Sequence, residues 1–250
     1  MIKIMKDATW LAWKAYDEPE DIAKELKHRG FTNFEWIDNT QYDTQAICCT
    51  KKGQIFIIIR GTEFTNIRDW ITNLDCSFKK TRWGDVHRGF YKDAYAISHT
   101  IYQYLSNHII NKAIFIGGHS QGAAVCTNLA MIMEDKYYFD LCFPIASPRT
   151  ASKDAAKNFG DKAGRKIHRV VNNNDIVTRI PTRFMGFNHI KDAGLWYFKE
   201  SKECVNEISF WADFKDRVSG QIKDIGHIGW DGLTDHKPEI YYNLVRGLNS

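Results

Sequence analysis

The chain contains 250 residues, of which 44% are hydrophobic and 26% charged, as is ordinary for a soluble globular protein. Its formal net charge of +4 is too small to indicate nucleic-acid binding, so nucleic acid is excluded as a partner. No run of about 18 apolar residues is present, which excludes a transmembrane helix.

The beginning of the sequence does not resemble a secretory signal peptide. Its apolar stretch is interrupted by Lys6, Asp7 and Lys14, and no cleavage site made of small residues follows. The six cysteines lack the spacing of metal ligands, and we expect them to be reduced thiols. These features predict a cytoplasmic protein, with a signal-independent route out of the cell left open.

Helix and strand signals alternate along most of the chain. Two runs, QIFIIIR at 54–60 and KAIFIGG at 112–118, are apolar and β-branched in the manner of strands buried on both faces. The other predicted elements are helix 8–28 with a restart after Pro19, strands 33–37 and 44–50, helices 90–109 and 121–134, strand 138–147, helix 150–160 and strand 165–172. This alternation predicts one α/β domain over residues 1–250, with a mainly parallel central sheet and helices on both faces.

The strand at 112–118 leads directly into the sequence Gly-His-Ser-Gln-Gly at 118–122, and a helix follows. A G-x-S-x-G pattern between a strand and a helix is typical of a nucleophile elbow, where a sharp turn lifts the serine hydroxyl above the sheet. Glycines flank the serine because a Cβ at either place would collide with a neighbouring strand or helix. We interpret Ser120 as a nucleophile and His119 as a structural residue that points elsewhere.

A serine nucleophile requires a histidine to accept its proton and an acid to hold that imidazole. In chains with such an elbow the acid and then the histidine follow the serine. Asp175 lies in the loop after the last predicted strand, where the acid is expected. The histidines after it are His189, His227 and His236, and the place of His236 at the start of the final helical stretch favours it as the base.

Several sequence blocks occur in the order found in a known family. They are IIIRGTEFTNIRDWITNL, DVHRGFYKDAY, GGHSQGAA, ASPRT, NNNDIVTRIP and LTDHKPEIYYN. In these blocks the chain resembles the class 3 lipases, the fungal-lipase-like group of α/β-hydrolases that also contains feruloyl esterases. The resemblance implies an α/β-hydrolase fold and serine-dependent hydrolysis of carboxylic acyl esters, acylglycerols above all, with no metal or organic cofactor. Phospholipase or feruloyl-type activity is the alternative, and a non-enzymatic lipid-binding protein is a further one.

The resemblance also implies roles for individual residues. Ser120 matches the family's nucleophile, Asp175 its acid and His236 its base. The RGT block contributes to the oxyanion hole, which implies that Thr62 is one donor and the backbone N–H of Gln121 the other. Removing one such donor typically lowers turnover by about 10²–10³.

An amphipathic helical pattern occupies the segment 63–80 after Thr62. Its apolar positions recur at helical spacing, and the ones we expect to contact substrate are Ile67, Trp70, Ile71 and Leu74. One interpretation is a surface helix packed on the core. The resemblance implies instead a lid that covers the acyl pocket in water and opens in transient contact with a lipid interface.

A second amphipathic pattern lies at 208–225, inside a segment, 199–230, that does not align with the family and that we expect to be a local insertion. Its apolar positions are Phe210, Trp211, Phe214, Val218, Ile222 and Ile225. This pattern fits a wall of the acyl channel, a dimer contact or packing on the core.

Overall fold

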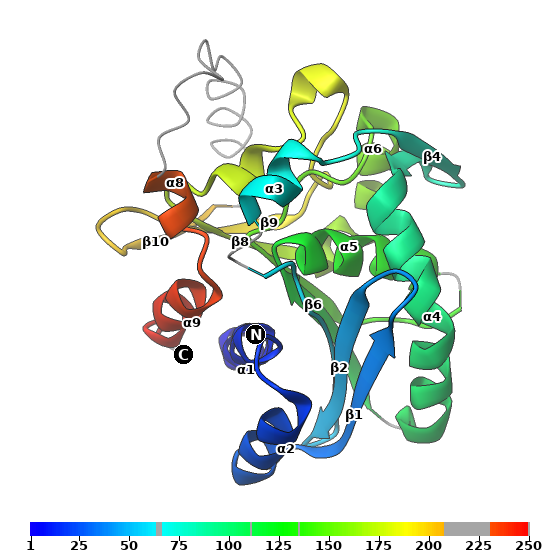
Figure 1. Ribbon diagram of the computed structural model, residues 1–250, viewed down its shortest axis with the longest axis vertical. Helices are drawn as coiled ribbons and strands as arrows, with labels where there is room; N and C mark the ends of the chain where they lie inside the picture. Colours follow the sequence, from blue (N-terminus) through cyan, green and yellow to red (C-terminus); the bar gives the residue numbers. More distant parts are fainter. Residues whose placement is uncertain (64–66, 111, 135, 208–230, 250) are drawn as a thin grey trace.

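The computed structural model describes residues 1–63, 67–110, 112–134, 136–207 and 231–249 (Figure 1). In this part of the chain the largest sheet has eight strands in the order β1-β2-β3-β6-β7-β8-β9-β10. These strands are β1 (Thr32–Asn39), β2 (Thr44–Lys51), β3 (Gln54–Ile59), β6 (Ala113–His119), β7 (Leu141–Ile145), β8 (His168–Asn172), β9 (Gly194–Phe198) and β10 (Cys204–Glu207). The strands from β3 to β9 pair in parallel and the outer ones antiparallel, which confirms the predicted α/β class.

Helices cover both faces of this sheet (Figure 1). One face carries α1 (Ile2–Lys14), α2 (Pro19–His28) and α9 (Pro238–Arg246), and the other carries α4 (Arg88–His108), α5 (Gln121–Met133) and α6 (Lys153–Ala163). Two apolar cores result, and neighbouring residues of β2 divide between them. Cys48 belongs to the core beneath α4 and α5, whereas Cys49 belongs to the core beneath α1 and α2, because successive strand residues point to opposite faces.

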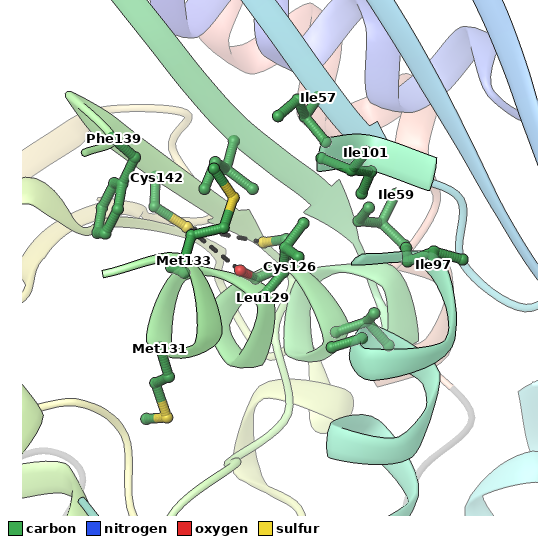
Figure 2. Close-up of a cluster of buried hydrophobic side chains, with 14 of the residues drawn as sticks. Ile57, Ile59, Ile97, Ile101, Cys126, Leu129, Met131, Met133, Phe139 and Cys142 are labelled. Carbon is green, nitrogen blue, oxygen red and sulfur yellow. Dashed lines mark hydrogen bonds between the residues drawn. The ribbon is translucent and has the colours of Figure 1, made fainter. Parts of the chain in front are cut away.

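The central strands are apolar on both faces, as parallel strands between two layers of helices must be. β3 and β6 pair in register, with Ile57 opposite Ile116, and both side chains are fully buried. From α5, Leu129 and Cys126 pack into the same core, and the Cys126 sulfur lies 3.8 Å from that of Cys142 on β7 (Figure 2). All six cysteines lie in the described part of the chain, and none of them forms a disulfide.

The helical pattern expected over residues 63–80 does not continue to the end of that segment, so this expectation was wrong there. The helix described there, α3, is short (Ile67–Thr72), and the chain then forms an antiparallel hairpin of β4 (Phe78–Thr81) and β5 (Gly84–His87). β4 reads FKKT and is mostly exposed, so it has neither the apolar alternation nor the buried run that reveals a strand.

Strands β9 and β10 were also missed, and they extend the sheet beyond β8. β10 falls inside the expected insertion at 199–230. Residues 208–230 lie outside the described residues, and with them the amphipathic pattern that contains Phe210 and Trp211, as well as His227. Among the helices that the structure describes, none combines the length and the apolar character needed to cross a bilayer.

Candidate active site

Ser120 lies at a sharp turn between β6, which ends at His119, and α5, which begins at Gln121. Its backbone has φ +58°, a left-handed conformation that is strained for a residue with a side chain. A Cβ on Gly118 would lie 2.4 Å from the carbonyl oxygen of Gly122, and a Cβ on Gly122 would lie 2.4 Å from that of Ile59. Both glycines are therefore required for the close contact of strand, turn and helix that the elbow needs.

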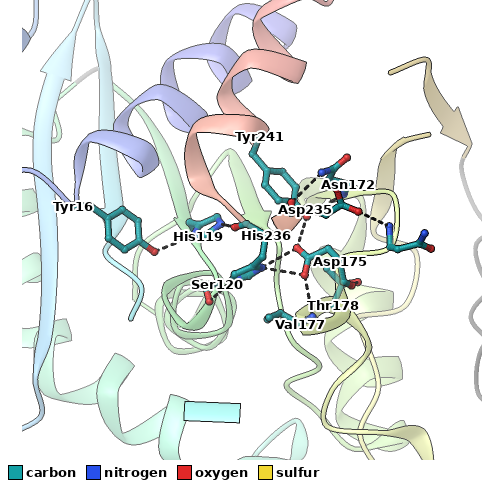
Figure 3. A network of polar contacts seen from close by, with 11 residues as sticks. Tyr16, His119, Ser120, Asn172, Asp175, Val177, Thr178, Asp235, His236 and Tyr241 are labelled. Carbon is teal, nitrogen blue, oxygen red and sulfur yellow. Dashed lines mark hydrogen bonds and ion pairs between the residues drawn. The ribbon is translucent and has the colours of Figure 1, made fainter. Parts of the chain in front are cut away.

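The imidazole of His236 lies between Ser120 and Asp175 (Figure 3). Its Nε2 is 2.7 Å from the Ser120 Oγ, and its Nδ1 is 2.8 Å and 3.0 Å from the two carboxylate oxygens of Asp175. All three side chains are almost completely buried. Because an ionised carboxylate can only accept, Nδ1 carries the proton and the lone pair of Nε2 faces the serine hydroxyl. The structure thus brings together the three residues that the sequence analysis selected.

Asp175 follows β8, and its buried carboxylate has further donors. It accepts hydrogen bonds from the backbone N–H of Val177, at 2.9 Å, and from the hydroxyl of Tyr241, at 2.6 Å. Tyr241 lies on α9 and in turn accepts from the backbone N–H of Asn172, at 3.0 Å. Burial and the negative charge of Asp175 hold the pKa of the Tyr241 phenol well above its usual value, so this hydroxyl stays a donor.

Tyr241 was missed by the sequence analysis. The available signal was its place on the final helix soon after His236, because a fully buried tyrosine needs a partner for its hydroxyl. The sequence had also suggested no role for the asparagines that precede Asp175. The side chain of Asn172 donates to the backbone carbonyl of Asp235 at 2.9 Å, and this bond joins the segment before Asp175 to the segment before His236.

Of the other candidate bases, only His189 lies among the described residues. The Nε2 atom of His189 lies 2.9 Å from the carbonyl oxygen of Thr178, and His227 lies outside the described residues. His119 is buried behind Ser120, and its ring points away from the serine hydroxyl (Figure 3).

The two residues expected in the oxyanion hole contact each other through their side chains. The hydroxyl of Thr62 donates to Oε1 of Gln121, and Nε2 of Gln121 donates to a carboxylate oxygen of Asp93 at 3.2 Å. The bond to Asp93 fixes the orientation of the amide, because a carboxylate accepts only from the NH₂ end. Asp93, on α4, is a further polar residue that the sequence analysis missed.

Thr62 and Gln121 border a cavity of about 380 Å³ between α3, α4 and the elbow. Its apolar lining includes Trp70, Leu74 and Phe90, and the ring of Trp70 stacks on that of Phe90 at 6.3 Å. Its polar lining includes three carboxylates, those of Asp69, Asp75 and Asp93. A cavity of this size beside the elbow fits part of a small ligand or an acyl group.

Trp70 on the short helix α3 and Leu74 just after it line this cavity. Trp70 and Leu74 are half-buried against the core beneath α4, whereas Ile71 packs on a separate cluster that contains Val177 and Leu233. The side chain of Ile67 lies outside the described residues. Of the four residues expected in the lid, three therefore pack against described residues, and the role of this segment as a lid stays a prediction.

Two titratable groups of the cavity have displaced pKa values. Burial raises the pKa of the Asp93 carboxyl to about 6, and the hydrogen bond from Gln121 offsets this effect only in part. Burial likewise lowers the pKa of the His87 imidazole to about 4. The cavity thus disfavours charge on both groups, as an environment partly removed from water does.

Comparison with known proteins places the chain among lipases. A sequence model of the class 3 lipase family matches residues 56–185, more than half of the chain. The secreted mono- and diacylglycerol lipases A of Penicillium cyclopium and Penicillium camembertii are each 24% identical over 230 residues, covering 87% of this chain and 72% of theirs.

Solved structures of fungal lipases share the fold. The triacylglyceride lipase of Rhizomucor miehei superposes with a TM-score of 0.71 at 17% identity, covering 95% of this chain and 96% of its own. Lipase II from Rhizopus niveus gives a TM-score of 0.68 at 19% identity, covering 80% and 81% of the two chains. These similarities confirm the α/β-hydrolase fold that the resemblance implied.

The expectation of a cytoplasmic protein was wrong. It is contradicted by the two Penicillium relatives, both of which are secreted lipases. The expectation rested on the missing signal-peptide pattern at the beginning of the sequence, and that pattern does not decide where a protein of this family acts.

Replacing Tyr241 by phenylalanine removes one donor from the buried carboxylate and also the acceptor of the Asn172 backbone N–H. We expect kcat for ester hydrolysis to fall about tenfold, since hydrogen bonds to charged groups contribute ~1.5–3 kcal/mol and Asp175 would orient His236 less firmly. The measurement is the initial rate on p-nitrophenyl butyrate. Tyr242→Phe is the matched control, because this neighbour stacks on Trp13 at 5.2 Å instead of contacting the acid. Equal rates in the two variants would contradict the role given to Tyr241.

Replacing Asp93 by asparagine should stabilise the protein above pH 6 and not at pH 4. The folded state binds the Asp93 proton more tightly than the unfolded chain does, so ionisation costs stability as pH rises from about 4 to about 6. We expect the Tm of Asp93→Asn to rise by about 2–6 °C at pH 7.5, after allowance for partial solvent screening. The control, Asp161→Asn, should give no such gain, because Lys191 and Lys157 lower the pKa of Asp161 to about 2. A gain for Asp93→Asn that is the same at both pH values would contradict this account.

Proposed function

The chain belongs to the class 3 lipase family and is a serine ester hydrolase, and we propose that Ser120, His236 and Asp175 hydrolyse the acyl esters of acylglycerols. The observation that carries the proposal is the alignment of the Ser120 hydroxyl, the His236 imidazole and the Asp175 carboxylate, at 2.7 Å and 2.8 Å. The two secreted relatives are mono- and diacylglycerol lipases, which favours partial glycerides as substrates of this chain also.

Acylation begins when the Ser120 Oγ attacks the ester carbonyl carbon while the Nε2 atom of His236 takes the hydroxyl proton. The imidazolium that forms is stabilised by the Asp175 carboxylate at Nδ1. When the tetrahedral intermediate collapses, the bond to the alcohol oxygen breaks and Nε2 returns its proton to that oxygen. An alcohol leaves, and Ser120 holds the acyl group as an ester.

Deacylation repeats these steps with water in place of the serine. His236 removes a proton from water, the hydroxide attacks the acyl carbon, and the Ser120 Oγ departs with the proton that Nε2 returns. The products are a free carboxylic acid and the original enzyme. The protein's own side chains supply each proton transfer in this cycle.

The negative oxygen of each tetrahedral intermediate requires donors. In the proposal these are the hydroxyl of Thr62 and the backbone N–H of Gln121, the first residue of α5. The N-terminal end of α5 adds a partial positive charge at the same place. Because the Thr62 hydroxyl donates to Gln121 Oε1 in the structure, it has to exchange that partner for the oxyanion.

We assign α3 the role of a lid over the cavity beside Thr62. Trp70 and Leu74 contribute an apolar surface that is half-buried while Trp70 stacks on Phe90. Once the helix moved away, lipid would cover this surface. A transient contact with a lipid surface would offset the cost of exposing them to water. The carboxylates in the cavity favour a second candidate substrate, an ester with a more polar acyl group such as feruloyl. A polar acyl group can hydrogen-bond to carboxylates, whereas a long alkyl chain cannot.

The assignment of Ser120 is tested with a fluorophosphonate, which labels an activated serine covalently. Ser120→Ala should lose labelling and all measurable hydrolysis of p-nitrophenyl butyrate, because no other group can form the acyl-enzyme. Ser147→Ala is the matched control, because this buried serine donates to the carbonyl of Pro148 at 2.9 Å and has no place in the proposed triad. Undiminished labelling of the Ser120→Ala protein would reject the proposal.

The lid and the substrate class are tested together with glyceride esters of increasing chain length. We expect the rate on tributyrin to rise steeply when its concentration passes the solubility limit, because a lipid surface then stabilises the displaced helix. Smooth saturation through that limit contradicts the lid. A feruloyl ester hydrolysed faster than every glyceride would favour the second candidate.

A further inference from the structure

Behind Ser120, His119 and Tyr16 form a chain of hydrogen bonds that is buried at His119 and partly buried at Tyr16 (Figure 3). Nε2 of His119 lies 2.8 Å from the backbone carbonyl oxygen of His236, and Nδ1 lies 2.9 Å from the phenol oxygen of Tyr16. Only 2% of His119 is exposed. None of these contacts involves the Ser120 hydroxyl, so the chain of bonds is separate from the proposed proton path.

The direction of each bond follows from its partners. A carbonyl oxygen can only accept, so Nε2 of His119 carries the proton and donates to His236. A neutral imidazole has a single N–H, and Nδ1 must therefore accept from the Tyr16 hydroxyl. Burial, together with the charge that His236 can carry, holds the pKa of His119 well below its usual value, and burial raises that of Tyr16. Both groups keep these protonation states over the working range of pH.

The far end of the chain of bonds reaches the loop of the proposed oxyanion hole. Gly61, immediately before Thr62, lies close against the phenol oxygen of Tyr16. A Cβ on Gly61 would lie 2.4 Å from that oxygen, so glycine is required for the tyrosine to approach. Tyr16 itself follows α1 and joins this loop to the elbow.

We propose that His119, oriented by Tyr16, is a positioning residue that fixes the backbone of His236 relative to the nucleophile. The inference rests on the proposed function, because it assigns His236 the role of base. His119 precedes Ser120 directly in the chain, so the donor and the nucleophile belong to one rigid turn. Any shift of the His236 loop away from Ser120 stretches the 2.8 Å bond to His119.

This bond acts on a part of the base that Asp175 does not hold. Asp175 contacts the imidazole at Nδ1, whereas His119 holds the peptide group at the other end of the same residue. With both ends fixed, the 2.7 Å distance between Nε2 and Ser120 Oγ has little freedom to vary. A misplacement of about 1 Å at such a contact can cost on the order of 10² in rate.

Two substitutions of His119 separate its two bonds. His119→Asn places a carbonyl oxygen near the former Nδ1, where it can accept from Tyr16, and removes the donor to His236. His119→Gln can place an NH₂ group near the former Nε2 and retain that donor. Tyr16→Phe removes the phenol hydroxyl alone and leaves the imidazole in place.

We expect His119→Asn to lower kcat on p-nitrophenyl butyrate about tenfold or more, because a buried carbonyl is left without its donor. KM should stay within about twofold, since His119 does not contact the substrate. His119→Gln should lose clearly less, and Tyr16→Phe about threefold. The His236 Nδ1–H, whose hydrogen bond Asp175 accepts, should give a low-field proton NMR signal. This signal should shift or broaden in His119→Asn and in Tyr16→Phe.

Tyr104→Phe is the matched control, because this buried phenol donates to the backbone carbonyl of Asn33 at 2.7 Å, a bond far from the base. It should change the Tm without changing kcat or the low-field signal. The inference is overturned if Tyr16→Phe behaves like Tyr104→Phe, or if His119→Asn and His119→Gln lose activity equally. Fluorophosphonate labelling of the wild-type protein separates the two hypotheses, since failure to label rejects the proposed function itself.

Discussion

A single buried carboxylate determines how the parts of this site must meet. Asp175 has no exposed surface, and an ionised group in such a place is stable only if its oxygens are satisfied by donors. The donors come from three places in the chain: the turn just after it, the imidazole of His236 and the hydroxyl of Tyr241 on α9. Satisfying this carboxylate therefore places the last helix at the end of β8, and His236, just before that helix, is placed with it. The strained turn at Ser120, stabilised by close contact of β3, β6 and α5, presents the serine hydroxyl to that imidazole from the other side.

Much of the fold was predictable because its central strands and helices have strong local patterns. β3 and β6 are continuous apolar runs, and the elbow has glycines at the two places where a Cβ would lie 2.4 Å from a backbone oxygen. The elements that were missed lack such patterns. β4 is exposed, and β9 alternates over only five residues. Their strand conformation depends on pairing partners elsewhere, which a local reading of the sequence cannot supply.

In the candidate site too, residues with a local sequence pattern were predicted, and residues whose role depends on folded contacts were missed. Ser120, Asp175 and His236 stand in sequence blocks that a family resemblance can match. Tyr241, Asp93 and Tyr16 were missed because their contacts depend on the folded arrangement. Tyr241 reaches an acid 66 positions earlier, and Tyr16 reaches a histidine 103 positions later. A buried hydroxyl or carboxyl has to find a partner, but the identity of that partner follows from the packing of helices on the sheet and not from spacing.

The hydrogen bond between Thr62 and Gln121 affects how strongly the site binds the transition state relative to the bound ester substrate. A neutral ester carbonyl is no better an acceptor than the amide oxygen that already holds the Thr62 proton, so exchanging one for the other gains little affinity for the substrate. A full negative charge on the tetrahedral oxygen is a much stronger acceptor and displaces the amide. With Thr62 in the proposed role, its donor contributes almost nothing to the Michaelis complex and is engaged only as the reaction proceeds, so its interaction free energy lowers the activation barrier instead of tightening substrate binding.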